Sequence, residues 1–204
     1  MSMSSKPAIS QSYYRRRNLM RHVGSYSDLI KSPWTGRKFK RGACLIRVKE
    51  HDKFYYIFPL QSDWERKKLV IRDFGGGVGE KETPVKAAIR EFHEESLHAF
   101  QIYLTKEVEM AAQVYTAKDT LYIIFDIEVD SIFEQIVDRF RKKRENLRLE
   151  YPSGIPKQYN ETASVISISR SDFLGIIERK EDTYKEIFIS NTLRNNAGEL
   201  YTIL

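Results

Sequence analysis

The chain has 204 residues, 41% of them hydrophobic, which is enough for one domain with a substantial core and an extension. Thirty-four basic and 28 acidic residues give a formal net charge of +6, which is compatible with an anionic substrate but not unusual for this length. A single cysteine, Cys44, excludes an intramolecular disulfide and a cysteine-based metal cluster. Because its neighbours Ala43, Leu45 and Ile46 are apolar, we expect Cys44 in the core.

The sequence also bears on location. It contains no stretch of about 18 apolar residues, so we expect no membrane span. Residues 1–18 lack the apolar segment that a secretory signal needs. Together with the single cysteine, these features predict an intracellular, cytoplasmic protein.

Residues 1–38 are predicted to form a basic, partly flexible N-terminal extension, and residues 39–204 to form one folded domain. The extension begins with a Ser-rich stretch, and basic residues interleaved with aromatic ones follow at 13–17 and around 34–41. Lys and Arg neutralise phosphates, and Tyr and Trp stack on bases, so such segments suit a nucleic acid or another polyanion.

Apolar periodicity and turn residues predict the elements of the domain in chain order. Strands are predicted at residues 43–48, 54–58, 68–71, 100–104, 108–115, 121–129 and 165–168. Helices are predicted from residue 84 onward and at residues 133–144, 171–179 and 184–195, with a loop at 151–156. Strands arranged around a central helix are typical of an α/β domain.

The central helix has a clear start and an apolar face. Thr83 supplies an N-cap hydroxyl, and Pro84 fits the first helical position, where no N–H is needed. The stripe by which the helix docks on a core consists of Val85, Ala88, Ile89 and Phe92.

A second stripe on this helix consists of Glu91, Glu94 and Glu95, within about one turn. Carboxylates at i,i+4 spacing repel by roughly 0.2–0.5 kcal/mol, and a hard divalent cation would relieve that repulsion. A run of three glycines at residues 75–77 precedes the helix and allows positive φ and a close approach to a ligand. The combination predicts a metal-assisted phosphate site, whereas a solvated acidic helix face is the alternative.

The same region matches a known family pattern. Residues 76–95 read GGVGEKETPVKAAIREFHEE and resemble the Nudix box, G-x5-E-x7-R-E-U-x-E-E-x-G-U, in which U is a bulky apolar residue. At average residue frequencies, a chance match of the six informative positions occurs about 5 × 10⁻⁸ times per starting point, so coincidence is excluded. The matching residues are Gly76, Glu82, Arg90, Glu91, Glu94 and Glu95.

The resemblance implies an α/β/α sandwich with a mixed sheet, and Mg²⁺ or Mn²⁺ as the cofactor. In Nudix hydrolases, the residues that match Glu91, Glu94 and Glu95 bind the metal and act in catalysis. A loop carbonyl, here that of Gly75, often joins them. The metal neutralises pyrophosphate oxygens and orients a water molecule for in-line attack.

The other box positions have structural roles in the family. Gly76 belongs to the loop. The residues that match Glu82 and Arg90 order the loop against the helix through a salt bridge. We also expect Arg90 to contribute to catalysis. The chain departs from the pattern at Leu97, where the family has glycine, and at His98, where it has an apolar residue. Since glycine there normally caps the helix in a left-handed conformation, we expect the helix to end differently or to continue.

The catalytic base varies within the family, and it is either a box glutamate or a glutamate from a later loop. Glu161, just before the strand predicted at 165–168, is the later candidate, and Glu128 and Asp126 are weaker ones. We expect surface or packing roles for His93 and His98, since His93 projects away from the carboxylate stripe.

The resemblance also implies a reaction, the hydrolysis of a pyrophosphate bond in a nucleoside diphosphate linked to another moiety. Arg41, Arg141, Lys142, Lys143 and Arg144 are candidate substrate-binding residues, and they favour capped RNA or a dinucleoside polyphosphate. A diphosphoinositol polyphosphate is an alternative, and a small nucleotide sugar or damaged nucleotide stays open. A catalytically silent Nudix fold that binds nucleic acid or protein is the other class, and a homodimer is compatible with either.

Overall fold

The computed structural model describes residues 22–25, 39–63, 67–128, 131–201 and 203–204. The basic and aromatic segments predicted at residues 13–17 and 34–38 lie outside these ranges. Within the predicted extension, strand β1 (His22–Ser25) pairs antiparallel with β6 (Gln113–Ala117) and lengthens one edge of the sheet. The domain boundary after residue 38 stays a prediction.

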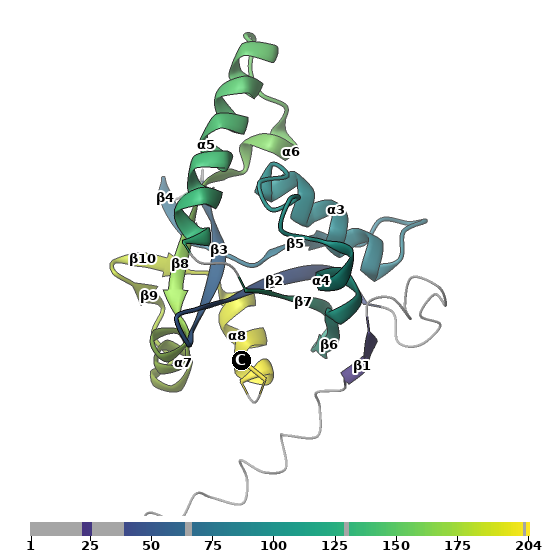
Figure 1. Ribbon diagram of the computed structural model, residues 1–204, viewed down its shortest axis with the longest axis vertical. Helices are drawn as coiled ribbons and strands as arrows, with labels where there is room; N and C mark the ends of the chain where they lie inside the picture. Colours follow the sequence, from purple (N-terminus) through teal and green to yellow (C-terminus); the bar gives the residue numbers. More distant parts are fainter. Residues whose placement is uncertain (1–21, 26–38, 64–66, 129–130, 202) are drawn as a thin grey trace, which may run out of the picture.

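The described strands form one mixed sheet of ten, with a main path ordered β1-β6-β7-β2-β3-β4-β10-β9 (Figure 1). Strand β2 (Arg41–Glu50) runs parallel to β7 (Thr120–Glu128) and antiparallel to β3 (Lys53–Asp63). Two strands pair outside the main path, β5 (Phe74–Gly77) with β2 and β8 (Thr162–Ser169) with β3. The others are β4 (Lys68–Ile71), β9 (Thr183–Tyr184) and β10 (Ile187–Ile189).

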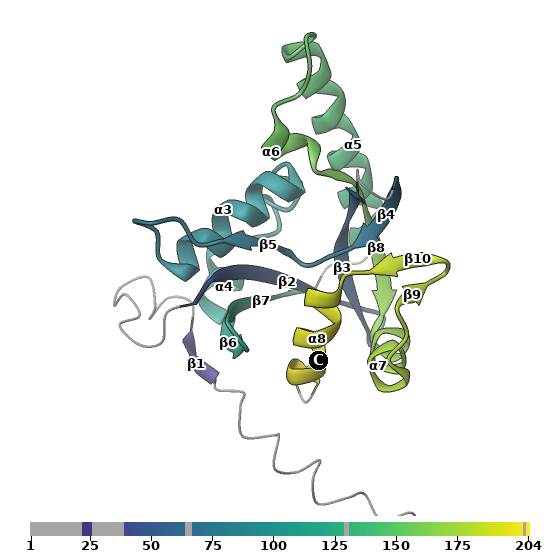
Figure 2. The ribbon, with the colours of Figure 1, turned by 180° about the vertical axis from the view of Figure 1, so that it is seen from behind.

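Helices cover both faces of this sheet, as Figures 1 and 2 show. Helices α3 (Pro84–Ser96) and α5 (Ile132–Glu150) pack on one face, and α7 (Arg170–Arg179) and α8 (Asn191–Leu200) pack on the other. Two short helices are α4 (Lys106–Ala111) and α6 (Lys157–Asn160). The predicted α/β fold with a mixed sheet is confirmed. None of the helices described has the length and hydropathy needed to cross a membrane.

An apolar core lies on each face of the sheet, because successive side chains of a strand point to opposite faces. In β2, Cys44 and Ile46 belong to the core under α3 and α5, whereas Ala43 and Leu45 belong to the core under α7 and α8. Full burial of one aliphatic side chain contributes about 1.5–3 kcal/mol. Strands predicted at residues 43–48, 54–58, 68–71, 121–129 and 165–168 correspond to β2, β3, β4, β7 and β8.

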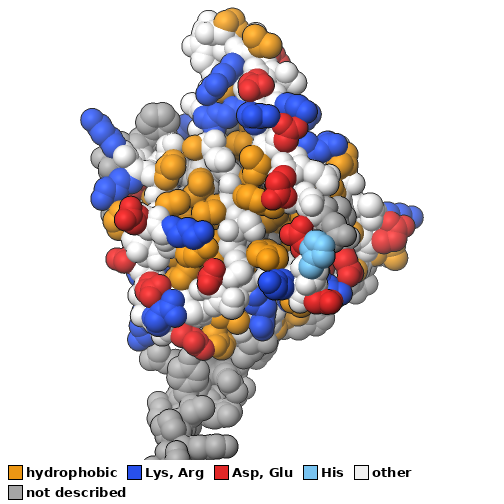
Figure 3. Space-filling model, turned by 60° about the vertical axis from the view of Figure 1, so that its left-hand side comes forward, with side chains coloured by type: hydrophobic (Ala, Val, Ile, Leu, Met, Phe, Trp, Pro, Cys, Tyr) orange, Lys and Arg blue, Asp and Glu red, His pale blue; other side chains and the backbone are white. Residues whose placement is uncertain are grey.

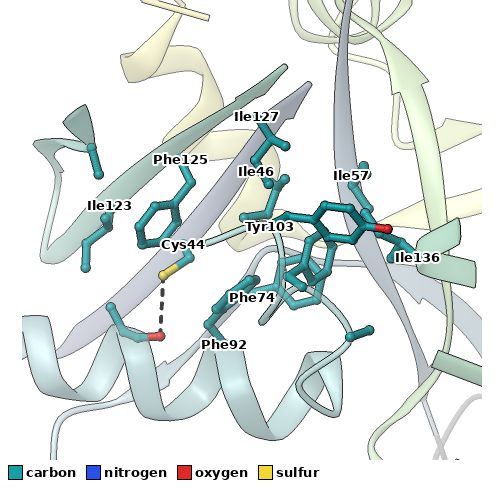
Figure 4. Close-up of a cluster of buried hydrophobic side chains, with 14 of the residues drawn as sticks. Cys44, Ile46, Ile57, Phe74, Phe92, Tyr103, Ile123, Phe125, Ile127 and Ile136 are labelled. Carbon is teal, nitrogen blue, oxygen red and sulfur yellow. Dashed lines mark hydrogen bonds between the residues drawn. The ribbon is translucent and has the colours of Figure 1, made fainter. Parts of the chain in front are cut away.

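The core under α3 holds the only cysteine of the chain (Figure 4). Cys44 points from β2 towards α3, with its Sγ atom 3.5 Å from the carbonyl oxygen of Ala88. Nearby, the rings of Phe74 and Phe92 meet edge to face with centroids 5.2 Å apart. Burial raises the pKa of the Cys44 thiol well above its ordinary value, so the reactive thiolate is scarce at neutral pH. Cys44 is therefore a core residue, as predicted.

Helix α3 begins as we predicted, but its C-terminal end does not follow our expectation. Thr83 Oγ1 accepts a hydrogen bond from the backbone N–H of Lys86 at 3.3 Å, and Pro84 occupies the first turn. The helix stops at Ser96, and Leu97 takes the left-handed conformation with φ 50°, as glycine does in the family pattern. The expectation of a different helix end is therefore wrong. Leu97 is only 3% exposed, and its burial offsets the roughly 1–2 kcal/mol that a left-handed backbone costs.

Two predicted strands are wrong. Residues 100–104 form turns, in which the backbone N–H of Tyr103 donates to Phe100 O at 2.8 Å. The ring of Phe100 is buried against those of Phe74 and Phe92 instead of pairing in the sheet. Residues 108–115 contain the end of α4 and the start of β6, because Thr105 caps a helix there. Apolar runs of this length do not distinguish a strand from other buried structure.

The helix predicted at residues 184–195 is a hairpin followed by a shorter helix. Strands β9 and β10 are joined by Lys185 and Glu186, with φ 47° and 67°, as in a type I′ turn. Lys and Glu are not the usual residues of such a turn, so the sequence does not predict it. Helix α8 starts at Asn191, after Ser190 Oγ accepts from the backbone N–H of Leu193 at 3.2 Å.

Candidate active site

A cavity of about 380 Å³ lies where the glutamate face of α3 meets β5 and the residues that follow β4 and β10. Four carboxylates from three parts of the chain line it, those of Asp73, of Glu91 and Glu95 on α3, and of Glu161. The other lining residues are Arg41, Gln61, Arg72, Gly75, Gly76, Ser190 and Thr192. The fold thus brings Glu161 to two of the three box glutamates.

Glu95 is the most buried of these carboxylates, with 4% exposure. One oxygen accepts a hydrogen bond from the side-chain amide of Gln61, and the other accepts from the backbone N–H of Gly75 at 2.8 Å. Burial, followed by the nearby charge of Asp73, raises the pKa of Glu95 well above its ordinary value. Glu95 is therefore held rigidly at the wall of the cavity. Gln61 was missed from the sequence, because it begins the polar end of β3, Gln61-Ser62-Asp63, and nothing there distinguishes it.

The carboxylate of Glu91 lies against the backbone of β5. A Cβ atom added at Gly76 would stand 2.3 Å from the Cδ and Oε1 atoms of Glu91, so any other residue would displace this carboxylate. Among the glycines described, Gly154 has positive φ, and Gly76 and its neighbours do not. The glycine run therefore provides space for the carboxylate and not the positive φ that we expected.

Arg90 connects the box glutamates. Its guanidinium contacts both oxygens of Glu82, at 3.0 and 3.1 Å, and donates to the backbone carbonyl of Gly77 at 3.2 Å. It also donates to Glu91 at 2.7 Å and to Glu94 at 3.2 Å. The hydrogen bond from Arg90 lowers the pKa of Glu82. Partial burial raises the pKa of Glu94, which is not among the lining residues.

Arg41, expected to bind substrate, is engaged within the protein. It donates to the two oxygens of Asp73 at 2.8 and 2.6 Å and to the carbonyl oxygen of Gly75 at 2.5 Å. Asp73 also accepts from the hydroxyl of Tyr122, which in turn accepts from the side-chain amide of Asn196 at 2.9 Å. This network lies beside the cavity and orients the Gly75 carbonyl. Asp73 was missed from the sequence, where its position just before the glycine run is the only hint.

Glu161 follows α6 directly and precedes β8. Its backbone carbonyl accepts from the N–H of Ser62 in β3 at 3.2 Å, which fixes the main chain beside the sheet. Among the residues described, no side chain or backbone group donates a hydrogen bond to its carboxylate. Glu161 therefore differs from Glu91 and Glu95, whose oxygens already accept hydrogen bonds.

The basic cluster predicted to bind substrate lies on α5, away from the lining of this cavity. Arg141 and Lys142 pair with Asp138 at 2.6 and 2.7 Å, and Lys143 lines a second cavity of about 390 Å³ between α5 and the end of α3. Arg144 bonds to the backbone carbonyl of Thr162 and to the Asn160 side chain. Lys and Arg side chains gather at the upper end of the molecule in Figure 3. The sequence could not reveal this separation, because it depends on how α5 packs.

The weaker candidates have other partners. Asp126 pairs with Arg47 at 2.5 Å, and Glu128 pairs with Lys49 at 2.9 Å, both across β2 and β7. The rings of His93 and His98 stack with centroids 4.7 Å apart. Asp126 and Glu128 therefore form ion pairs within the sheet, and His93 and His98 pack against each other, as we expected for a surface or packing role.

The donors around the cavity suit a hard divalent cation in chemical type. Carboxylates of Glu91 and Glu95 and the carbonyl of Gly75 are the oxygen ligands that Mg²⁺ and Mn²⁺ prefer. In the part of the chain that is described, however, no three His, Cys, Asp or Glu side chains are arranged to hold a metal. Gln61 donates to one oxygen of Glu95, and Arg90 donates to one oxygen of Glu91.

No family model and no curated protein matches the chain. Three solved structures that it resembles are the C. elegans Ap4A hydrolase in a binary complex, the M. smegmatis Nudix hydrolase RenU and a mutT/nudix family protein from Listeria innocua. Their identities are 17%, 10% and 15%, and their TM-scores are 0.38, 0.38 and 0.34. The matches cover 81%, 83% and 69% of this chain and 99%, 88% and 83% of those chains. Likenesses of this degree establish no substrate, metal or residue role.

Proposed function

We propose that this chain is a divalent-metal-dependent Nudix pyrophosphohydrolase, with its active site in the 380 Å³ cavity. The observation that carries the proposal is the meeting of Glu91, Glu95 and Glu161 at one cavity beside the β5 backbone. Glu91 and Glu95 belong to a box whose spacing resembles that of Nudix hydrolases. Glu161 follows Glu95 by 66 residues in the chain. A solvated acidic helix face gives no reason for such a meeting.

Glu91, Glu95 and the Gly75 carbonyl would hold Mg²⁺ or Mn²⁺, with Glu94 joining once Arg90 releases it. A bound metal would supply charge neutralisation at the pyrophosphate oxygens and orientation of the attacking water. Arg90 carries the counter-charge for Glu91 and Glu94, which limits their mutual repulsion.

Glu161 is the base that we favour. A base must have an oxygen within reach of the water molecule, and Glu91 and Glu95 are already assigned to the metal. The carboxylate of Glu161 accepts no hydrogen bond from the residues described and lines the cavity. It would take the proton of the water as the water oxygen attacks phosphorus, and the leaving phosphate departs from the opposite side.

The cationic groups favour a substrate with several phosphates. Arg72 lines the cavity and is exposed, and within the described residues no acidic side chain pairs with it. On α5, Arg141 and Lys142 are each 68% exposed and so accessible to a polyanion. These features support capped RNA or a dinucleoside polyphosphate, with a diphosphoinositol polyphosphate as the alternative.

The direct test is a substrate panel with Mg²⁺ or Mn²⁺, read by chromatography of the phosphorylated products. It contains capped RNA, diadenosine polyphosphates, ADP-ribose, a nucleotide sugar, oxidised dGTP and diphosphoinositol pentakisphosphate. We expect turnover of a polyphosphate substrate that stops when the metal is chelated. Lack of turnover on every substrate would overturn the proposal.

A catalytically silent binding module is the second candidate, and the contacts of Arg90 are compatible with it. Arg90 neutralises Glu91 and Glu94 internally, so these carboxylates have a counter-charge within the protein. Titration calorimetry with Mn²⁺ together with the substrate panel separates the two candidates, because only an enzyme couples metal binding to turnover. Light scattering of the purified chain tests the possible homodimer, and cell fractionation tests the predicted cytoplasmic location.

A further inference from the structure

Arg144 holds the chain on both sides of Glu161. Its Nη1 group donates to the backbone carbonyl of Thr162, the residue after Glu161. Its Nη2 group donates to the side-chain oxygen of Asn160, the residue before Glu161, at 3.1 Å. One guanidinium therefore bridges the end of α6 and the start of β8, with Glu161 between them.

Both elements that Arg144 connects are anchored in the protein. Helix α5, which carries Arg144, is anchored in the core by Ile132, Ile136 and Phe140, all at most 3% exposed. Thr162 is 1% exposed and continues into β8, which pairs with β3 along its length. Between these two anchors, the main chain at Glu161 is held by the Ser62 N–H and by Arg144.

We propose that Arg144 is a positioning residue that sets the Glu161 carboxylate in the cavity for its role as base. The proposal rests on the function proposed above. It separates Arg144 from Arg141, Lys142 and Lys143, with which the sequence grouped it as a substrate-binding residue. Arg144 acts through hydrogen-bond geometry, whereas the other three present accessible charge on α5.

A lysine substitution distinguishes geometry from charge. Arginine donates through a planar fork and reaches two acceptors at once, whereas the lysine ammonium is a point charge on a flexible chain. R144K therefore keeps the positive charge and loses the double contact. If the residue bound substrate through its charge alone, R144K would behave like the wild-type chain.

The experiment compares kcat and KM of the wild type, R144K, N160A, E161Q and the R144K/E161Q double variant. The matched control is R179K, at an exposed arginine of α7 that pairs with Glu181. We expect R144K to lower kcat about 10–100-fold with KM little changed, because displacement of a catalytic group by about 1 Å costs this much. N160A, which removes one contact of the bridge, lowers kcat less. R179K leaves kcat and KM unchanged.

The double variant gives the decisive comparison. If Arg144 acts through Glu161, R144K lowers kcat in the wild-type background and has no further effect in the E161Q background. A general loss of structure would instead reduce kcat by the same factor in both backgrounds and would overturn the inference. A wild-type kcat for R144K would also overturn it.

Amide hydrogen exchange over residues 157–163 provides a readout that does not depend on turnover. We expect faster exchange there in R144K than in R179K, and equal exchange would contradict the bridge. A wild-type chain inactive on all substrates would overturn the proposed function. An active chain in which R144K behaves as wild type would overturn only the role of Arg144.

Discussion

Arg41 and Asp73 form a two-point ion pair beside the cavity, with nitrogen–oxygen distances of 2.8 and 2.6 Å. The Asp73 side chain is 1% exposed and that of Arg41 is 19% exposed, so water does little to screen the pair. Arg41 also donates a hydrogen bond to the backbone carbonyl of Gly75, and the backbone N–H of Gly75 donates to the carboxylate of Glu95. The ion pair therefore supports the β5 backbone that donates a hydrogen bond to Glu95.

Asp73→Asn should lower the free energy of unfolding by about 3 kcal/mol, because it leaves a largely buried guanidinium without its counter-charge. Urea denaturation monitored by circular dichroism measures the change. Asp126→Asn is the matched control, since its carboxylate is 52% exposed, against 1% for Asp73. That control should change stability by less than about 1 kcal/mol, and an equal loss in both variants would contradict a special role for Asp73.

Glu95→Gln and Glu94→Gln should each cut turnover by at least about 100-fold, since each removes a charged ligand from the proposed metal site. The fold should persist, because glutamine preserves the shape and Glu95 is buried at a cost in its charged form. Glu128→Gln, on the exposed end of β7, serves as the control with unchanged turnover. Normal kcat in both box variants, measured at saturating Mn²⁺, would refute the metal assignment.

Neutralising Arg141, Lys142 and Lys143 together should weaken binding of long polyanions far more than binding of small nucleotides. Each lost phosphate contact should reduce the slope of log Kd against log salt concentration by about 0.7–0.9. Arg144 is kept in this variant, because its contacts are internal. Fluorescence anisotropy with capped RNA and a small nucleotide across salt concentrations measures both effects, and equal weakening would remove the argument for RNA.

The Cys44 thiol should resist an aromatic disulfide reagent at pH 8 in the folded chain and react fully after unfolding in guanidinium. Burial raises its pKa, so the thiolate that attacks such reagents is depleted relative to a free cysteine across this pH range. Reaction is followed by absorbance, and the control is the unfolded chain at the same pH. Rapid modification of the native chain would place the thiol outside the core.

Leu97→Gly should lower the free energy of unfolding by about 1–3 kcal/mol. Loss of a buried leucine side chain costs about 2–5 kcal/mol, and relief of the left-handed backbone returns about 1–2 kcal/mol. Lys180→Gly is the control, because Lys180 caps α7 with φ 55° and is exposed. Thermal denaturation should show Leu97→Gly destabilised and Lys180→Gly unchanged or stabilised; stabilisation of both would mean that Leu97 contributes little by its burial.

The sequence by itself determined the features that depend on neighbours in the chain. Thr83 and Pro84 start α3 through contacts within one turn, and the spacing of Glu91 and Glu95 puts both on one helical face. The apolar run at residues 43–46 likewise indicates a buried strand with Cys44 in the core. These patterns are readable because helix and strand periods are local properties of the backbone.

Only the tertiary structure decided which distant residues meet those glutamates. Gln61 lies 34 residues from Glu95, and Arg41 lies 32 residues from Asp73, so no local period relates either pair. Arg144 was assigned by its charge to substrate, yet the packing of α5 turns it towards the chain around Glu161. Partners across strands and helices are selected by how the layers pack, which depends on the volumes of many side chains at once.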